Sequence, residues 1–117
     1  DDELNFEIEQ VYPANQNQIY HLQSGANLIS YIIPYEQTVT NAFPDETEQY
    51  FLSLIGEGLA AQQITSGWVG NLVYLKKQKG YWAILDLTDC PVLDNPNNGE
   101  CYQDSFGNTV LKFQWNN

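Results

Sequence analysis

The stretch "SGANLISYIIPY", residues 24–35, is the best guide to the fold. It opens on a Ser-Gly turn signal, continues through mostly apolar residues and stops at Pro34. A short run of β-branched and aromatic side chains between turn residues predicts a β-strand. We therefore expect this stretch to form part of a sheet, with neighbouring strands on both sides of it in the sequence.

Similar segments recur along the chain, separated by Gly, Pro and Asn residues. Some alternate between apolar and polar side chains, as half-buried strands do, and others are short apolar runs. Besides residues 24–34, strands are expected over residues 4–11, 19–23, 50–58, 59–64, 80–87 and 109–117. Tyr81 and Trp82 are neighbours in one of these strands, so they must point to opposite faces and only one of them can lie in the core.

One segment is expected to be helical. Val39, Ala42 and Phe43 have the i, i+3, i+4 spacing of a helix face, and Thr38 is suited to cap the helix start. Pro44 follows at once and limits the helix to one or two turns.

The remaining segments predict turns and loops within one domain. "TSGWVGNL" reads as a turn, and residues 72–78 read as a helical or 3₁₀ turn with Leu72 and Leu75 facing inward. A chain of 117 residues is long enough for one core. We expect a mainly β fold, a small single-domain β-barrel or sandwich with one or two short helices. Its expected parts are a core over 18–87, a loop over 88–108 and a last strand over 109–117.

The charge of the chain excludes several classes of partner. Fifteen acidic residues face four lysines and no arginine, giving a formal net charge of −11. Nucleic acids and anionic membrane surfaces are bound through Lys and Arg, so neither is expected as a partner. No run approaches the roughly 20 apolar residues that cross a bilayer, so membrane insertion is not expected either.

Two cysteines, Cys90 and Cys101, enclose the turn-forming segment "PVLDNPNNGE". A thiolate metal site would require more ligands nearby, and a redox pair is usually closer in sequence. A structural disulfide is therefore predicted, and it indicates an oxidising compartment. Closing a loop of this size contributes about 2–3 kcal/mol in the chain-entropy model.

From "SGANLISYIIP" through "IGEGLAAQQI" and "GWVGNL" to "KGYWAILDL", the chain resembles a known type of module. It is similar to the "GWNLIS…GYW" modules of secreted and surface proteins of bacteria and archaea, and of marine phage-like sequences. The resemblance covers residues 18–87 and implies a non-catalytic ancillary module with no catalytic residue to carry over. Ala26 stands where the family has Trp. The matching positions are Gly25, Asn27, Leu28, Ile29, Ser30, Val39, Phe43, Ile55, Gly56, Gly67, Trp68, Gly80, Tyr81 and Trp82.

The residues themselves also give little indication of catalysis. His21 is the only histidine, and none of the serines lies in a G-x-S-x-G context. Glu57, between Gly56 and Gly58, is the acid most open to a role in glycoside chemistry, but we expect it to be an exposed acid in a turn. We expect His21 to be an ordinary sheet residue and the protein not to be an enzyme.

The cysteine loop invites comparison with a calcium site. "LDNPNNGECYQD" places Asp94, Asn98 and Gly99 as an EF-hand would, but Pro96 and Ser105 occupy ligand positions, so that motif fails. No cofactor is expected. An irregular Ca²⁺ site remains as a minor alternative, with Asp89, Asp94, Glu100 and Asp104 as its ligands.

These observations lead to two hypotheses of function. The first is a non-catalytic extracellular structural or interaction module: a surface-protein repeat, a filament or appendage subunit, or a virion component. Its partners would be other protein subunits, joined by strand addition at "NFEIEQVY" or "VLKFQWNN". The second is a carbohydrate-binding module that stacks sugar rings on Trp68, Tyr74, Tyr81 and Trp82.

Overall fold

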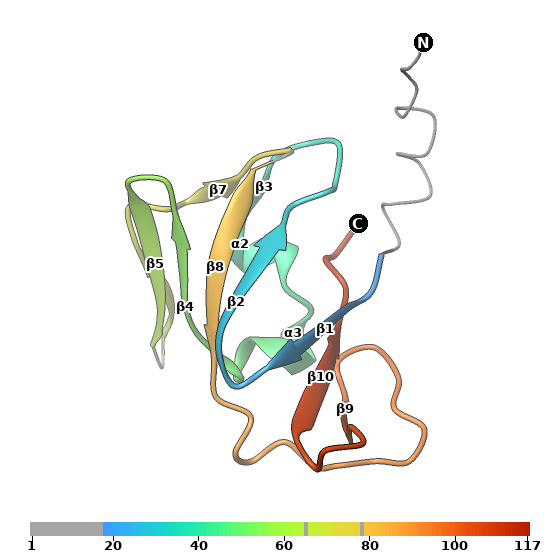
Figure 1. Ribbon diagram of the computed structural model, residues 1–117. Helices are drawn as coiled ribbons and strands as arrows, with labels where there is room; N and C mark the ends of the chain where they lie inside the picture. The colour runs from blue at the N-terminus through green and yellow to red at the C-terminus, as the bar shows by residue number, and fades with distance from the viewer. Residues whose placement is uncertain (1–17, 65, 78) are drawn as a thin grey trace, which may run out of the picture.

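The strands of the computed structural model lie in three antiparallel sheets, described for residues 18–64, 66–77 and 79–117 (Figure 1). The largest sheet has the order β2-β8-β4-β5-β6, the second β1-β10-β9, and the third β3-β7. The fold is mainly β, as expected, and the sheets do not close into a barrel. The strand expected at residues 4–11 lies outside the described residues. The bounds are β1 Tyr20–Gln23, β2 Gly25–Ser30, β3 Gln37–Thr38, β4 Phe51–Gly56, β5 Leu59–Ile64, β6 Gly67–Gly70, β7 Tyr74–Leu75, β8 Gly80–Leu85, β9 Cys101–Gln103 and β10 Thr109–Phe113.

A corner at Ser24 joins the two larger sheets. β1 pairs with β10 in one sheet and β2 pairs with β8 in the other, although only Ser24 separates them. The amide of Asn27 spans the corner: its Oδ1 accepts from the Gln23 N–H at 3.0 Å, and its Nδ2 donates to the Gln23 carbonyl at 2.8 Å. The expected turn is therefore confirmed, while the strand after it ends at Ser30, before Pro34.

The hairpin of β4 and β5 and the inner strand β8 occupy the predicted positions. β4 and β5 are joined by a tight turn at Glu57 and Gly58, where Gly58 has a φ of 69°. β8 lies between β2 and β4 and pairs with both of them. Alternation in β8 buries Tyr81 and exposes Trp82, so that only one of the two lies in the core, as the sequence predicts.

Two segments form strands where turns were expected. Residues 67–70 form β6, because Trp68 pairs with Gln63 and its ring stacks on Phe43. These tertiary contacts override the turn preference of the flanking glycines. Tyr74 and Leu75 form β7 instead of a helical turn, and Leu72 and Leu75 are buried as expected.

Two one-turn helices follow β3. α2, Val39–Ala42, is capped by Thr38, whose Oγ1 accepts from the Asn41 N–H at 3.2 Å, and it ends before Pro44 as predicted. α3, Asp45–Glu48, begins directly after that proline. Its position was not predicted, but two short helices agree with the one or two that were expected. No helix in the described part of the chain has the length and apolar character needed to cross a membrane.

The core is centred on the ring of Phe43, just after α2. This ring is fully buried and lies 4.6 Å from the Phe51 ring of β4 and 5.5 Å from the Phe113 ring of β10, measured between centroids. Trp68 of β6 and Trp115, after β10, lie at 5.1 and 5.2 Å. One side chain therefore contacts strands of both larger sheets, which pack as two layers around it.

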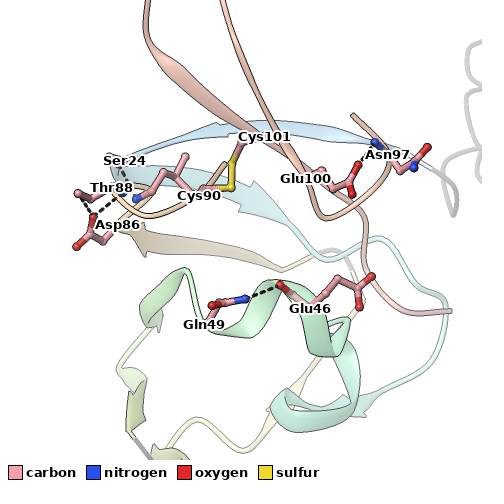
Figure 2. The surroundings of a disulfide bond; sticks show 10 residues. Ser24, Glu46, Gln49, Asp86, Thr88, Cys90, Asn97, Glu100 and Cys101 are labelled. Atoms are coloured by element: carbon pink, nitrogen blue, oxygen red, sulfur yellow. Dashed lines mark hydrogen bonds between the residues drawn. A yellow bond between two sulfur atoms is a disulfide. The ribbon is translucent and has the colours of Figure 1, made fainter. Parts of the chain in front are cut away.

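The predicted disulfide joins Cys90 to Cys101. It closes the loop above α3, and Glu46 and Gln49 lie beneath it (Figure 2). Gly99 approaches α3 so closely that a Cβ there would lie 2.9 Å from the Glu46 Cγ. The segment 88–108 is not loop throughout, because Cys101 begins β9, which pairs with β10. The disulfide is consistent with an oxidising environment.

Removing the ring of Phe43 is predicted to destabilise the whole fold. Phe43→Ala leaves a cavity between both sheets and should lower the free energy of unfolding by about 3–5 kcal/mol, measured by urea denaturation. Phe106→Ala is the matched control, because Phe106 is 88% exposed and its loss should change stability by less than about 0.5 kcal/mol. Equal effects of the two substitutions would contradict the central role of Phe43.

The double variant Cys90→Ala/Cys101→Ala should unfold more easily than the native protein. The two cysteines are 11 positions apart, and loss of this closed loop should lower the free energy of unfolding by about 2–3 kcal/mol. Reductant should destabilise the native protein similarly and leave the double variant unaffected. A reductant effect of the same size on both proteins would contradict this account.

Candidate functional site

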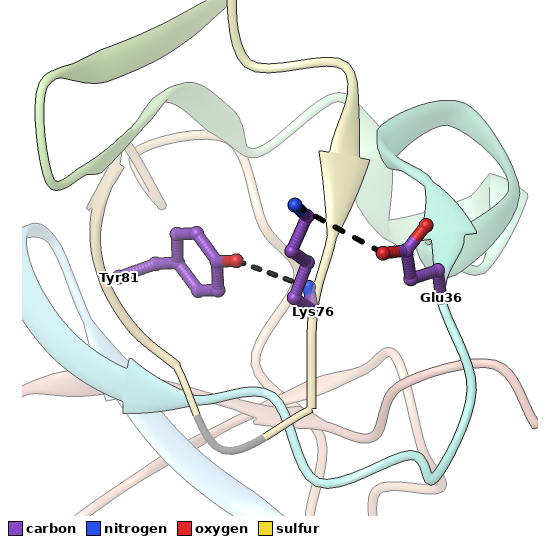
Figure 3. Close-up of polar contacts among 3 residues, drawn as sticks. All are labelled: Glu36, Lys76 and Tyr81. Carbon is purple, nitrogen blue, oxygen red and sulfur yellow. Dashed lines mark hydrogen bonds and ion pairs between the residues drawn. The ribbon is translucent and has the colours of Figure 1, made fainter.

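The four aromatic residues expected to stack on sugars occupy different environments. The Trp68 ring stacks on Phe43 with an interplanar angle of 22°, and its Nε1 donates to the Glu48 Oε2 at 3.0 Å. Tyr81 is 5% exposed, and its hydroxyl accepts from the Lys76 N–H at 3.1 Å (Figure 3). Trp68 and Tyr81 are therefore used in packing.

Tyr74 and Trp82 are the two exposed members of that set, at 53% and 48% exposure. Tyr74 belongs to the small sheet β3-β7, whereas Trp82 lies on β8, an inner strand of the five-stranded sheet. Trp82 is part of an exposed, largely apolar surface of that sheet.

That surface is the outer face of the five-stranded sheet, opposite the core. Strand pairing aligns Leu28 of β2, Trp82 of β8 and Ile55 of β4 in one row, because Leu28 pairs with Trp82 and Trp82 with Ile55. Their exposed fractions are 64%, 48% and 40%. Side chains at positions two residues along each strand share this face. The outer face consists of Ala26, Leu28, Ser30, Ser53, Ile55, Ala60, Gln62, Ile64, Val69, Gly80, Trp82 and Ile84.

No charged residue occurs in any of the five strands. In a chain with a net charge of −11, charges are thus kept out of the whole sheet, including the strands at its two ends. Edge strands are commonly protected by charged residues, and exposed apolar faces of this kind are typical of interaction sites. The outer face is therefore our candidate functional site.

Sequence reasoning identified Trp82 but not its neighbours on this face. Leu28 and Ile55 are distant in sequence, and only the strand register brings them to the same row. The one feature of the sequence that could have pointed to this face is the absence of charged residues from all five strands of the sheet.

His21 lies on β1 beside a hollow of about 410 Å³. Its Nδ1 is 3.0 Å from the Tyr102 hydroxyl, and its partner across the strand pair is Lys112. The cysteine loop forms the other side of the hollow through Val92, Leu93 and Pro96. Within the described residues, His21 contacts neither a Ser nor a Cys nucleophile, and its hydrogen-bond partner is Tyr102.

Glu57 is exposed in the β4–β5 turn and lines a second hollow, of about 280 Å³. The buried face of Tyr81 and the exposed Tyr74 line the same hollow, together with Lys76. Lys76 also forms an ion pair with Glu36 at 4.0 Å (Figure 3). Both ends of that pair are more than half exposed, so it contributes little to stability.

The acids considered for calcium are spread along the cysteine loop and the β9–β10 turn. Glu100 accepts from the Asn97 N–H at 2.8 Å, and Asp104 accepts from the N–H groups of Phe106 and Asn108 at 2.9 Å each. Across residues 18–64, 66–77 and 79–117, no three His, Cys, Asp or Glu side chains are grouped to hold a metal ion. A site at Asp89, Asp94, Glu100 and Asp104 therefore stays a prediction.

The carboxylate of Asp104 stabilises its turn in the charged form. The hydrogen bond from the Asn108 N–H is the largest cause that lowers the pKa of Asp104 below its ordinary value of 3.8. Because the pKa is lower in the folded protein, the stabilisation is present above 3.8 and is lost as the pH falls through the lowered pKa.

Asp104→Ala should therefore lower the free energy of unfolding at pH 7, and the difference from the native protein should shrink in acid below 3.8. Chemical denaturation at both pH values measures this. Asp94→Ala is the control, because Asp94 makes no hydrogen bond within the described residues. A difference that grows in acid would contradict the prediction.

Comparisons with known proteins add no relative to this description. The chain matches no family model, no curated protein and no solved structure. The resemblance to "GWNLIS…GYW" modules therefore stays a prediction, and the functional argument depends on the geometry of the outer face.

Proposed function

We propose that the chain is a non-catalytic interaction module that binds a partner protein through the outer face of its five-stranded sheet. The observation that carries this proposal is the row of Leu28, Trp82 and Ile55, exposed on a sheet without charged residues. Covering this face would remove apolar surface from water, at about 25 cal/mol per Å². No carboxylate of the sheet would need to lose its hydration on binding.

The proposal includes an extracellular or cell-surface setting, such as a surface-protein repeat, a filament subunit or a virion component. The disulfide supports this setting, because such bonds persist in oxidising compartments. The sequence analysis expected a partner to add a strand at one of the two terminal segments, and the proposed surface is a different one. β10 lies between β1 and β9, so "VLKFQWNN" has no open edge for its strand, and "NFEIEQVY" lies outside the described residues.

Site-specific photocrosslinking in the native assembly tests the proposal. A benzophenone amino acid placed at Trp82 or Ile55 should form adducts with a protein identifiable by mass spectrometry. The same probe at Phe106, which is 88% exposed and outside the five-stranded sheet, is the matched control. Equal labelling from position 106, or no protein adduct from either face position, would contradict the proposal.

Carbohydrate binding is the second candidate function, and the exposed indole of Trp82 is the observation that favours it. Sugar rings stack on the faces of Trp and Tyr side chains. Binding would change the Trp fluorescence on titration with polysaccharides, and Trp82→Ala would abolish the change. The protein-binding proposal expects no such response.

A further inference from the structure

We propose that a second copy of this chain joins the free edge of β2, so that the two five-stranded sheets become one continuous sheet. This inference goes beyond the proposed function, because it concerns the open edge of β2 and leaves the outer face of the sheet exposed. β2 is the end strand of its sheet, and β8 occupies only one of its edges.

The hydrogen-bonding pattern shows which groups of β2 face the open edge. The N–H of Tyr31 donates to the Lys79 carbonyl at 2.9 Å, which continues the β2–β8 ladder. In an antiparallel pair, alternate residues bond to the neighbour, so Tyr31, Ile29 and Asn27 bond toward β8. The backbone N–H and C=O groups of Ala26, Leu28 and Ser30 therefore point to the open edge.

Side chains form hydrogen bonds to the open edge of β2 only at its Ser30 end. The Ser30 carbonyl accepts from the Tyr20 hydroxyl and from the Trp115 Nε1, both at 2.9 Å. Within the described residues, no side chain bonds the backbone of Ala26 or Leu28. These two residues therefore present the donors and acceptors that remain available to another strand.

This restriction selects one symmetric arrangement. Antiparallel pairing of two β2 strands about a two-fold axis at Asn27 places Ala26 of each copy opposite Leu28 of the other. The available N–H and C=O groups are then paired across the interface. The small side chain of Ala26 also leaves room for the partner's Leu28, which is 64% exposed in the single chain.

The absence of charged residues from β2 reduces the repulsion between two copies that pair along this edge. Two chains of net charge −11 repel one another, and the repulsion is weakest where neither contributes a charged residue. β2 and its neighbours β8 and β4 carry none. Lys and other charges that commonly prevent edge-to-edge pairing are missing from β2.

The interface is narrow, and this sets the expected affinity. Pairing along one short strand buries less than the roughly 800 Å² per partner of a standard interface. We therefore expect a reversible dimer that forms at micromolar to millimolar concentration and becomes stronger when the chain is held in a larger array.

Sedimentation equilibrium over a concentration series tests the inference with two charge variants. Leu28→Glu places like charges at the paired edge and should raise the dissociation constant by about tenfold or more. Val69→Glu is the matched control: Val69 is 45% exposed on the same face but lies on β6 at the opposite end of the sheet. Its dissociation constant should stay within about twofold of that of the native protein.

Disulfide crosslinking tests the register independently. Ala26→Cys and Leu28→Cys chains should crosslink faster when mixed than either does alone, because residues 26 and 28 face each other across the two-fold. Paired strands hold opposed Cα atoms about 5.5 Å apart, within disulfide range.

Three results would overturn the inference: a native protein monomeric up to millimolar concentration, equal weakening by Val69→Glu, or a mixture that crosslinks no faster than the single variants. A monomeric protein whose position 82 still crosslinks to a different protein would overturn self-pairing alone. Absence of any protein adduct from positions 82 and 55 would contradict the proposed function separately.

Discussion

The packing of Phe43 against aromatic rings from both larger sheets holds this fold together. The ring contacts Phe51 in the five-stranded sheet and Phe113 in the three-stranded sheet. A phenylalanine of this kind contributes several kilocalories per mole when it is fully buried, and its position depends on α2 ending at Ala42, just before Phe43 and Pro44. The two layers are thus oriented by one ring, and the helix that carries it is only one turn long.

Because aromatic side chains fill the space between the layers, one face of the five-stranded sheet is buried and the other is exposed to solvent. Tyr81 and Ala83 of β8 contribute to the core, while Trp82 stays outside. Among the described residues, the acidic side chains lie in helix α3, in turns and connecting segments and in the cysteine loop, and none lies in a strand of the five-stranded sheet. The charged side chains and the exposed apolar side chains therefore occupy different parts of the described structure, and the proposed binding surface is the uncharged one.

Much of this arrangement could be predicted from local patterns, and the rest depends on contacts between distant residues. The alternation in residues 80–87 correctly predicted that only one of Tyr81 and Trp82 lies in the core, and the capping residue Thr38 correctly marked the start of a helix. The strand β6 was missed because its glycines favour a turn, and only stacking of Trp68 on Phe43 makes the segment extended. The row of Leu28, Trp82 and Ile55 was missed because register is not encoded in any one segment.

The corner at Ser24 has a consequence for how chains of this fold can change in length. A single residue separates strands of two sheets, and the Asn27 amide fixes the distance between them. Insertion of one residue there would shift β2 by one position and turn Leu28 inward and Ile29 outward. Divergent sequences should therefore keep the spacing from Gln23 to Asn27 constant, while gaining or losing residues freely between the two cysteines.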